Sequence, residues 1–239
     1  MIKNTKYRSS TFTSVAGAAF LALVLGVSFS LRKPKVFVIG DSISMHYGPY
    51  LKKSLEGFFE YDRKRDKGQA LEDLDKPVGA NGGDSQRVRN YLDKLLQDPG
   101  FHTDYLLVNC GLHDIKTKPG TGDIQVSLQA YEENLDAIVK QAKKLRAQLV
   151  WVTTTPVVDS IHNRSMGGFH RYARNLDAYN QVARGIMNKN KVPVIDLYTY
   201  TVKFGPGVFK DHVHFDHKTR EKQADFIAGA LAEIHRLRG

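Results

Sequence analysis

The chain has 239 residues, 41% of them hydrophobic and 25% charged, an ordinary globular composition that is long enough for one domain with a substantial core and requires no second. Its formal net charge of +10 fits an anionic partner such as acidic polysaccharide or membrane headgroups, but the basic residues are scattered, so no nucleic acid partner is expected. A single cysteine, Cys110, excludes an internal disulfide.

The N-terminus has the pattern of an export signal or a membrane anchor. An uncharged apolar run, Ser14 to Phe29, follows a basic start. The basic residues before the run are Lys3, Lys6 and Arg8. The run is short for a bilayer span of ~20 residues, which favours a signal peptide. The first strand follows the run closely and leaves almost no linker for cleavage, so an uncleaved anchor through residues 11–31 is the alternative. In both cases we expect residues 1–31 to be a leader and residues 32–239 to be the domain. The domain would be periplasmic, extracellular or anchored at the outer face of the cytoplasmic membrane. Because no cysteine follows the run, no lipoprotein anchor is expected.

Beyond the leader, short apolar β-rich runs alternate with longer helical patterns, which is typical of βαβ units. The predicted strands are 35–39, about 58–61, 104–110, 149–155 and 192–197, and the predicted helices are 46–57, 84–97, 127–147, 169–189 and 217–236. In helix 127–147 the apolar residues recur at spacings of three and four, so one stripe faces a sheet. The charged segment 62–76 reads as a surface excursion. The pattern predicts an α/β fold, a three-layer α/β/α sandwich with a parallel sheet of about five strands.

Polar clusters follow the predicted strands. The clusters are Gly40-Asp41-Ser42, Asn81-Gly82-Gly83-Asp84-Ser85, Gly111-Leu112-His113-Asp114 and, after the last strand, Asp211-x-x-His214. In open parallel α/β sheets the ligand site lies beyond the carboxyl ends of the strands, so the four clusters are expected to meet at one edge. Together they would supply a hydroxyl nucleophile, a base with its orienting acid, and donors for an oxyanion.

The stretch DHVHFDH, residues 211–217, allows a second interpretation. If it were extended, His212 and His214 would share one face, and two imidazoles with a carboxylate are a plausible zinc set. The same letters contain Asp211 three positions before His214, an acid placed to orient a base. Spacing alone does not choose between the two, but the serine-bearing turn after the first strand favours a hydrolase that needs no metal and no cofactor.

The order and spacing of these motifs resemble the SGNH (GDSL-type) hydrolases over nearly all of the chain beyond the leader. The resemblance implies a flavodoxin-like SGNH hydrolase fold in which Ser42 is the nucleophile, His214 its base and Asp211 the acid that orients the base. It also implies that the backbone N–H groups of Ser42 and Gly83 are two donors of the oxyanion hole. The third donor in that family is an asparagine in Gly-x-Asn-Asp, and here this position is His113. A neutral imidazole still carries one N–H, and it could donate if a partner on its other nitrogen fixes the tautomer.

Four further residues are candidates for contact with the substrate: Asp41, Asp114, Arg164 and His212. For the two aspartates the alternative is a turn-forming hydrogen bond, and for His212 it is a place on the pocket rim. Arg164 belongs to the long stretch 153–175, and a loop of that length in a compact domain is often functional. Because this stretch has no apolar run, it argues against a long acyl-chain tunnel and favours a carbohydrate or another polar ester.

The sequence predicts a serine esterase that works through an acyl-enzyme, with O-acetyl groups of a polysaccharide as the first choice of substrate. A short-chain lipase or thioesterase is the alternative within this class. The alternative from another class is a non-catalytic envelope binding domain of the same fold. The expected partner is a small acyl ester or an acylated polysaccharide, and nothing in the sequence indicates an oligomeric state.

Overall fold

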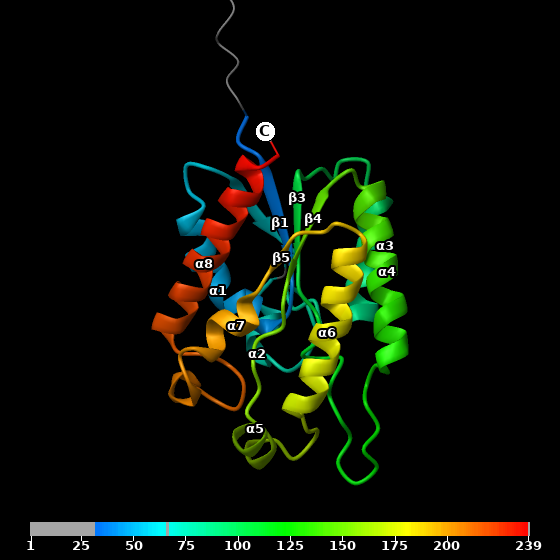
Figure 1. The fold of residues 1–239 in the computed structure, drawn as a ribbon, viewed down its shortest axis with the longest axis vertical. Coiled ribbons are helices and arrows are strands. Elements are labelled where there is room, and N and C mark those ends of the chain that lie inside the picture. Colours follow the sequence, from blue (N-terminus) through cyan, green and yellow to red (C-terminus); the bar gives the residue numbers. More distant parts are fainter. Residues whose placement is uncertain (1–31, 66, 239) are drawn as a thin grey trace, which may run out of the picture. The chain divides into compact units, whose positions relative to one another are not determined.

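A computed structural model describes residues 32–65 and 67–238 (Figure 1). Five strands form one sheet in the order β2-β1-β3-β4-β5, and every neighbouring pair is parallel. The strands are β1 Lys35–Ile39, β2 Glu60–Arg63, β3 Tyr105–Val108, β4 Gln148–Val152 and β5 Val194–Ile195. The predicted α/β fold with a five-stranded parallel sheet is confirmed.

The helices cover both faces of the sheet, because the residues of β1, β3 and β4 are almost all buried and need apolar cover on each side. The longer helices are α1 Ser42–Ser54, α3 Ser85–Leu96, α4 Leu128–Lys144, α6 Ala173–Lys189 and α8 His217–Arg236. Helices α1 and α8 pack together on one face, and α3, α4 and α6 lie on the other (Figure 1). The apolar stripe predicted for residues 127–147 is the buried side of α4.

Four short helices were not predicted: α2 Gln69–Glu72, α5 Asp159–Ser165, α7 Leu197–Val202 and the 3-10 turn η1 Pro206–Val208. Several boundaries also differ from the prediction; α1, for example, begins at Ser42 rather than at 46. Helix α6 begins at Ala173 rather than at 169, because the backbone of His170 exchanges two hydrogen bonds with Thr117 in an isolated bridge. Strand β5 ends at Ile195, because the next residue, Asp196, already caps α7.

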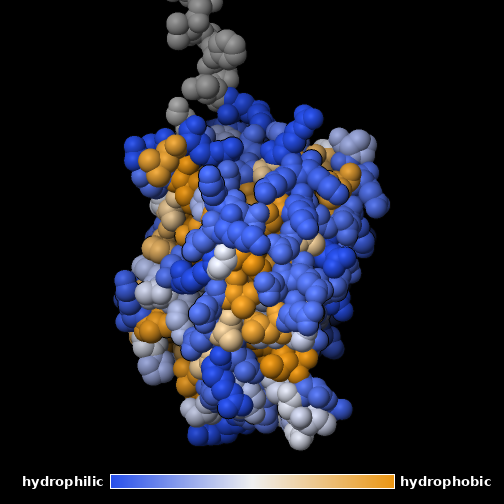
Figure 2. All heavy atoms as spheres, turned by 45° about the vertical axis from the view of Figure 1, so that its right-hand side comes forward, coloured by the Kyte–Doolittle hydropathy of each residue, from blue (hydrophilic) through white to orange (hydrophobic). Residues whose placement is uncertain are grey.

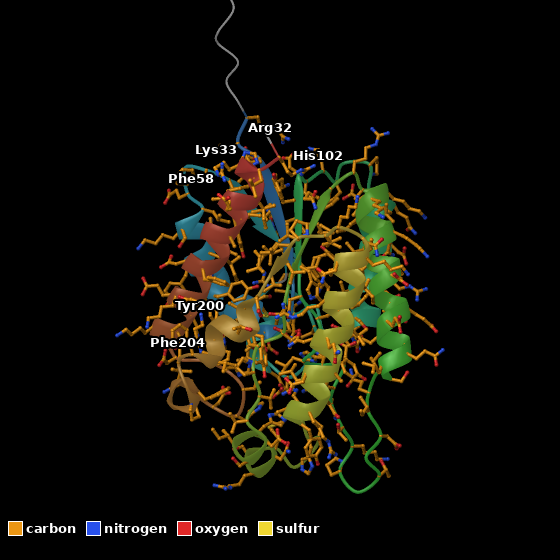
Figure 3. All side chains as sticks on the ribbon, viewed as in Figure 1. Arg32, Lys33, Phe58, His102, Tyr200 and Phe204 are labelled. Atoms are coloured by element: carbon orange, nitrogen blue, oxygen red, sulfur yellow. The ribbon has the colours of Figure 1, made fainter. Side chains whose placement is uncertain are left out.

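The loops that follow the strands all lie at the carboxyl edge of the sheet, the lower edge in Figure 1, where α2 and α5 are also found. Figure 3 shows Lys33, Phe58 and His102 at the opposite edge of the sheet, where the strands begin. The segment before β1 therefore lies far from the carboxyl ends of the strands. The face shown in Figure 2 is mainly hydrophilic, with apolar side chains in a central patch and in smaller patches toward its edges. Over the described ranges no helix has the length and apolar character required to cross a membrane, and the predicted leader, residues 1–31, lies outside those ranges.

Candidate active site

Ser42, the predicted nucleophile, is the first residue of α1. Asp41 ends the turn after β1 and caps the helix, since its Oδ1 accepts a hydrogen bond of 3.0 Å from the N–H of Ile43. An N–H in the first turn of a helix has no partner within the helix, so the amide of Ser42 is placed to donate to a ligand. Ser42 is only 2% exposed, so its hydroxyl lies below the surface at the carboxyl edge of the sheet.

The structure brings Ser42 together with Asp211 and His214, which lie 169 and 172 positions later in the chain. The Nε2 atom of His214 lies 2.7 Å from Oγ of Ser42. On the other side of the ring, Nδ1 of His214 lies 2.9 Å from Oδ2 and 3.0 Å from Oδ1 of Asp211. Since a carboxylate only accepts hydrogen bonds, Nδ1 carries the hydrogen and Nε2 is left to accept the hydroxyl proton of Ser42. This is the geometry of a nucleophile, a base and an orienting acid.

The carboxylate of Asp211 is held in its charged form. Partial burial alone would raise its pKa, but hydrogen bonds from the His214 ring and from the N–H groups of Val213 and His214 hold this pKa well below its usual range. The charge therefore persists at any pH where the imidazole is the base. An imidazolium formed at His214 would be stabilised by this neighbouring charge.

The predicted oxyanion donor Gly83 has its N–H engaged inside the protein. Its N–H donates to Oδ1 of Asn81 over 3.0 Å, in a turn that Gly83 makes with a φ of 72°. Only glycine fits there, because a Cβ would come within 2.5 Å of the Cβ of Pro77. The turn lies beside the serine loop, since the N–H of Gly82 donates to the carbonyl of Gly40 over 2.8 Å. For Gly83 to serve an oxyanion, its N–H would have to turn from Asn81 or be shared with it.

His113, the predicted substitute for an asparagine donor, is buried and neutral. Burial, with the nearby charges of Lys116 and Arg171, holds its pKa well below the usual value, and only 1% of the residue is exposed. Among the described residues, its Nδ1 has no hydrogen-bond partner. The direct partner that the sequence required to fix the tautomer is therefore not found there. A buried ring nitrogen costs less without a partner when it carries no hydrogen, which favours the tautomer with its N–H on Nε2.

Asp114 and Asp41 are buried and bind backbone groups. Both oxygens of Asp114 accept from the N–H of Ser85, at 2.9 and 3.1 Å, which ties the start of α3 to the loop after β3. Asp41 is used as the cap of α1, and burial raises its pKa. These contacts match the turn-forming alternative for the two residues.

We expect the stability of the protein to fall with rising pH because of Asp114. Complete burial is the main reason that its pKa is raised from 3.8 to about 7. Between those two values the folded chain binds more protons than the unfolded chain, so the free energy of unfolding decreases as pH rises. Between pH 5 and pH 8, the Tm of the wild type should drop by about 5 to 10 °C relative to the Tm of Asp114→Asn, which cannot ionise.

Calorimetric Tm measurements across this pH range check the expectation. Asp98→Asn is the control, because the Asp98 carboxylate also accepts from a backbone N–H, that of Gly100, but is exposed. A difference between wild type and Asp114→Asn that stays constant with pH would contradict the argument.

A cleft of about 910 Å³ opens beside the Asp211–His214 pair. Its walls are residues of two segments: Gln69, Leu71, Glu72, Asp73, Leu74, Asp75, Lys76, Val78 and Gly79 on one side, and Asp211, His212 and His214 on the other. Much of the stretch 62–76, predicted as a surface excursion, is thus a wall of the cleft. In the sequence, the alternating charges of this stretch resemble those of a solvent-exposed surface. Its position beside the cleft could therefore not be predicted from the sequence.

The other two candidates for substrate contact differ in position. His212 lines the cleft, but its Nε2 lies 3.1 Å from Oδ2 of Asp75 and its Nδ1 lies 2.9 Å from Nδ1 of His162. Both of its ring nitrogens are therefore engaged within the protein. Arg164 is exposed on α5 and is not among the residues that line the cleft.

Several residues of the site had no signal in the sequence. His46 lies one turn after Ser42 on α1 and packs edge-on against the ring of His214, with centroids 4.8 Å apart. Burial is the main cause that lowers the pKa of His46 to about 4, so this ring stays neutral beside the base. Asp75 and Arg171 lie in loops and His162 lies on α5, and contacts with one another and with His212 join them in a polar network beside the cleft.

A metal set can be drawn from the same cluster. One ligand atom from each of Asp211, His212 and His214 lies within 4.8 Å of the others. The ring nitrogens of both histidines already bind Asp211, Ser42, Asp75 or His162. A metal ion would have to displace these contacts, so the residues fit a proton-transfer site better than a metal site.

Comparison with known proteins places this geometry in context. A model of the GDSL-like lipase/acylhydrolase family matches residues 38–221. The lipase/acylhydrolase from Enterococcus faecalis has a similar structure, with a TM-score of 0.60, 16% identity, and coverage of 83% of this chain and 95% of that one. A GDSL-like lipase from Parabacteroides merdae has a TM-score of 0.61 at 16% identity over 84% and 96% of the two chains. The esterase EstA from Pseudoalteromonas has a TM-score of 0.60 at 14% identity over 85% and 100%.

A curated relative is the uncharacterized lipoprotein YqeF of Bacillus subtilis. It is 24% identical to this chain over 154 residues, which are 59% of this chain and 60% of the relative. The match thus spans about three fifths of that protein.

Proposed function

We propose that Ser42, His214 and Asp211 carry out ester hydrolysis in this chain. The chain belongs to the GDSL-like lipase/acylhydrolase family and is a serine hydrolase acting on esters. The observation that carries this proposal is the 2.7 Å contact between Nε2 of His214 and Oγ of Ser42, with Asp211 on the opposite ring nitrogen. A non-catalytic binding domain would have no need of a base aimed at a serine hydroxyl.

In the proposed mechanism, Oγ of Ser42 attacks the ester carbonyl while Nε2 of His214 takes the hydroxyl proton. The imidazolium, stabilised by the carboxylate of Asp211, then returns that proton to the leaving alcohol as the C–O bond breaks. Water enters next, gives a proton to His214 and attacks the acyl-enzyme, and the proton passes back to Oγ of Ser42 as the acid leaves. No cofactor takes part in these steps.

The negative charge on the carbonyl oxygen needs donors on the side away from His214. We assign the amide of Ser42, the amide of Gly83 after its release from Asn81, and Nε2–H of His113 to this task. The low pKa of His113 supports its role, because a neutral ring can donate from Nε2 without bringing a competing cation beside the base.

For the substrate, we propose O-acetyl groups on a carbohydrate. The support is the cleft beside His214, whose walls carry mostly polar and charged side chains from residues 69–79 and 211–214. A short-chain lipase or thioesterase is the second candidate. It is favoured by a separate apolar pocket of about 260 Å³ that includes Phe215, the residue after His214.

The two candidates differ in what they release. We expect the purified domain to free acetate from acetylated polysaccharides, and to hydrolyse nitrophenyl acetate at least about tenfold faster, in kcat/KM, than nitrophenyl octanoate. Ser42→Ala is the blank for both assays. A rate that rises with acyl length, with no acetate freed from any polysaccharide, would favour the lipase or thioesterase.

We also propose that the chain works outside the cytoplasmic membrane. The support is the basic start and apolar run of residues 1–31, together with the similarity to a Bacillus lipoprotein. Residues 32–239 would then be the exported or anchored hydrolase domain.

A further inference from the structure

Arg171 is a buried cation that touches the loop of the proposed oxyanion donor. Its side chain is 1% exposed, and its Nε donates to the carbonyl of Leu112, the residue before His113, over 2.7 Å. Burial lowers its pKa to about 10, so the guanidinium still carries its charge at neutral pH. A charge placed this deep is costly unless it is paired and hydrogen-bonded.

The partner of this cation is Asp75, on the wall of the cleft. Nη2 of Arg171 lies 3.4 Å from Oδ1 of Asp75, and Nζ of Lys116 donates to the Asp75 carbonyl over 2.8 Å. Burial alone would raise the pKa of the Asp75 carboxyl, but the hydrogen bond from His212 and the charge of Arg171 hold it well below its usual range. Asp75 is therefore a carboxylate whose two oxygens face two different partners.

The second partner of Asp75 lies in the loop of the proposed base. Nε2 of His212 lies 3.1 Å from Oδ2 of Asp75, and Nδ1 of His212 lies 2.9 Å from the buried His162. His212 is flanked by Asp211 and Val213, so a fixed ring at this position also fixes the peptide groups of the loop. One of those groups, the N–H of Val213, donates to Asp211.

We propose that Arg171, Asp75 and His212 form a network that positions the two halves of the active site relative to each other. One end holds Leu112 and with it His113, and the other end holds the loop of Asp211 and His214. Arg171 and Asp75 are then positioning residues, which act on the reaction without touching the substrate. This inference rests on the proposed function of His113 and His214.

The size of the effect follows from how steeply catalysis depends on position. A displacement of about 1 Å of a reacting group can cost ~10²-fold in rate, even when the cause lies away from the chemistry. Losing the Asp75 charge frees both loops, whereas losing the Arg171 fork frees mainly the loop of Leu112 and His113, because Asp75 keeps its contact with His212. The turnover number should fall, while the walls of the cleft keep their substrate contacts.

The test uses Asp75→Asn and Arg171→Lys, each alone and combined with His113→Ala. Hydrolysis of nitrophenyl acetate is measured, and the number of active sites is counted by titration with an alkyl phosphonate ester. We expect kcat per titrated site to fall about 10- to 100-fold in each single variant, with KM within about threefold of wild type. Asp75→Glu, which keeps the charge, should recover part of the loss.

The combined variants separate positioning from simple support of the fold. If Arg171 acts through His113, Arg171→Lys should cost less than about threefold in the His113→Ala background. Arg184→Lys is the matched control, because Arg184 also pairs with an aspartate, Asp196 at 2.5 Å, but lies outside the network. It should leave kcat per site unchanged.

Each outcome bears on one claim. Wild-type kcat per titrated site in both Asp75→Asn and Arg171→Lys would overturn the positioning network, and so would a loss in Arg171→Lys that multiplies fully with that of His113→Ala. Wild-type activity of His113→Ala alone would instead remove His113 from the oxyanion hole. In that case a reduced kcat in Asp75→Asn would still support the end of the network that holds the His214 loop, and an unchanged kcat would overturn it.

Discussion

Replacing Ser42 by alanine is expected to lower kcat for ester hydrolysis by about 10⁴- to 10⁶-fold while KM changes little. The variant removes the only atom that forms the covalent bond, and His214 is left with no hydroxyl to deprotonate. The residual rate would come from binding and from the oxyanion donors, which remain in place. The fold should survive the substitution, because the N-terminus of α1 is capped by the side chain of Asp41 and not by that of Ser42.

Release of nitrophenol from a short-chain ester measures this loss. Ser54→Ala is the matched control, since Ser54 is the last residue of the same helix and its hydroxyl donates to the Tyr50 carbonyl or the Asp225 carboxylate. The double variant Ser42→Ala, His214→Ala should be no slower than Ser42→Ala alone, because residues that act as one unit are not additive. Substantial turnover in Ser42→Ala would assign the nucleophile elsewhere.

The second large effect is expected at His113. His113→Ala should lower kcat by about 10²- to 10³-fold, the usual cost of one oxyanion donor. The loss should appear in kcat and kcat/KM alike, because the oxyanion exists in the transition state and not in the bound ester. Single-turnover kinetics on nitrophenyl acetate would separate this chemical step from product release.

His113→Asn provides the informative comparison. It introduces the amide that the SGNH family carries at this position, and it should recover part of the activity lost in His113→Ala. His217→Ala is the control for removing a histidine near the site, because His217 is exposed and its ring hydrogen-bonds the hydroxyl of Tyr50. Activity of His113→Ala within a few-fold of wild type would leave the oxyanion to the two backbone amides.

The turn of Gly83 bears on the same question. Its N–H donates to Asn81 in the structure, so the proposed oxyanion hole would combine an amide already engaged elsewhere with a histidine in place of an asparagine. The cost of releasing Gly83 would reduce the net gain from that donor. The contribution of His113 to turnover should then be at the upper end of the expected range.

The sequence by itself determined the fold class and the identity of the clusters at the strand ends. Strand and helix periodicities are local properties, and the sheet places every carboxyl end at one edge, so Ser42, His113 and the pair Asp211–His214 could be predicted to meet. The predicted helix starts near α3 and α8 were accurate to within a residue, because each begins just after a capping aspartate, Asp84 or Asp216.

Only the tertiary structure decided what surrounds those clusters. The roles of Asp75 and Arg171 depend on loops 96 residues apart in the chain, and their charges in sequence look like an ordinary solvated surface. Likewise, the turn in which Asn81 takes the N–H of Gly83 depends on φ angles that glycine permits but does not dictate. Local preferences select elements, whereas hydrogen-bond partners across loops are selected by which groups the packed core brings within about 3 Å of each other.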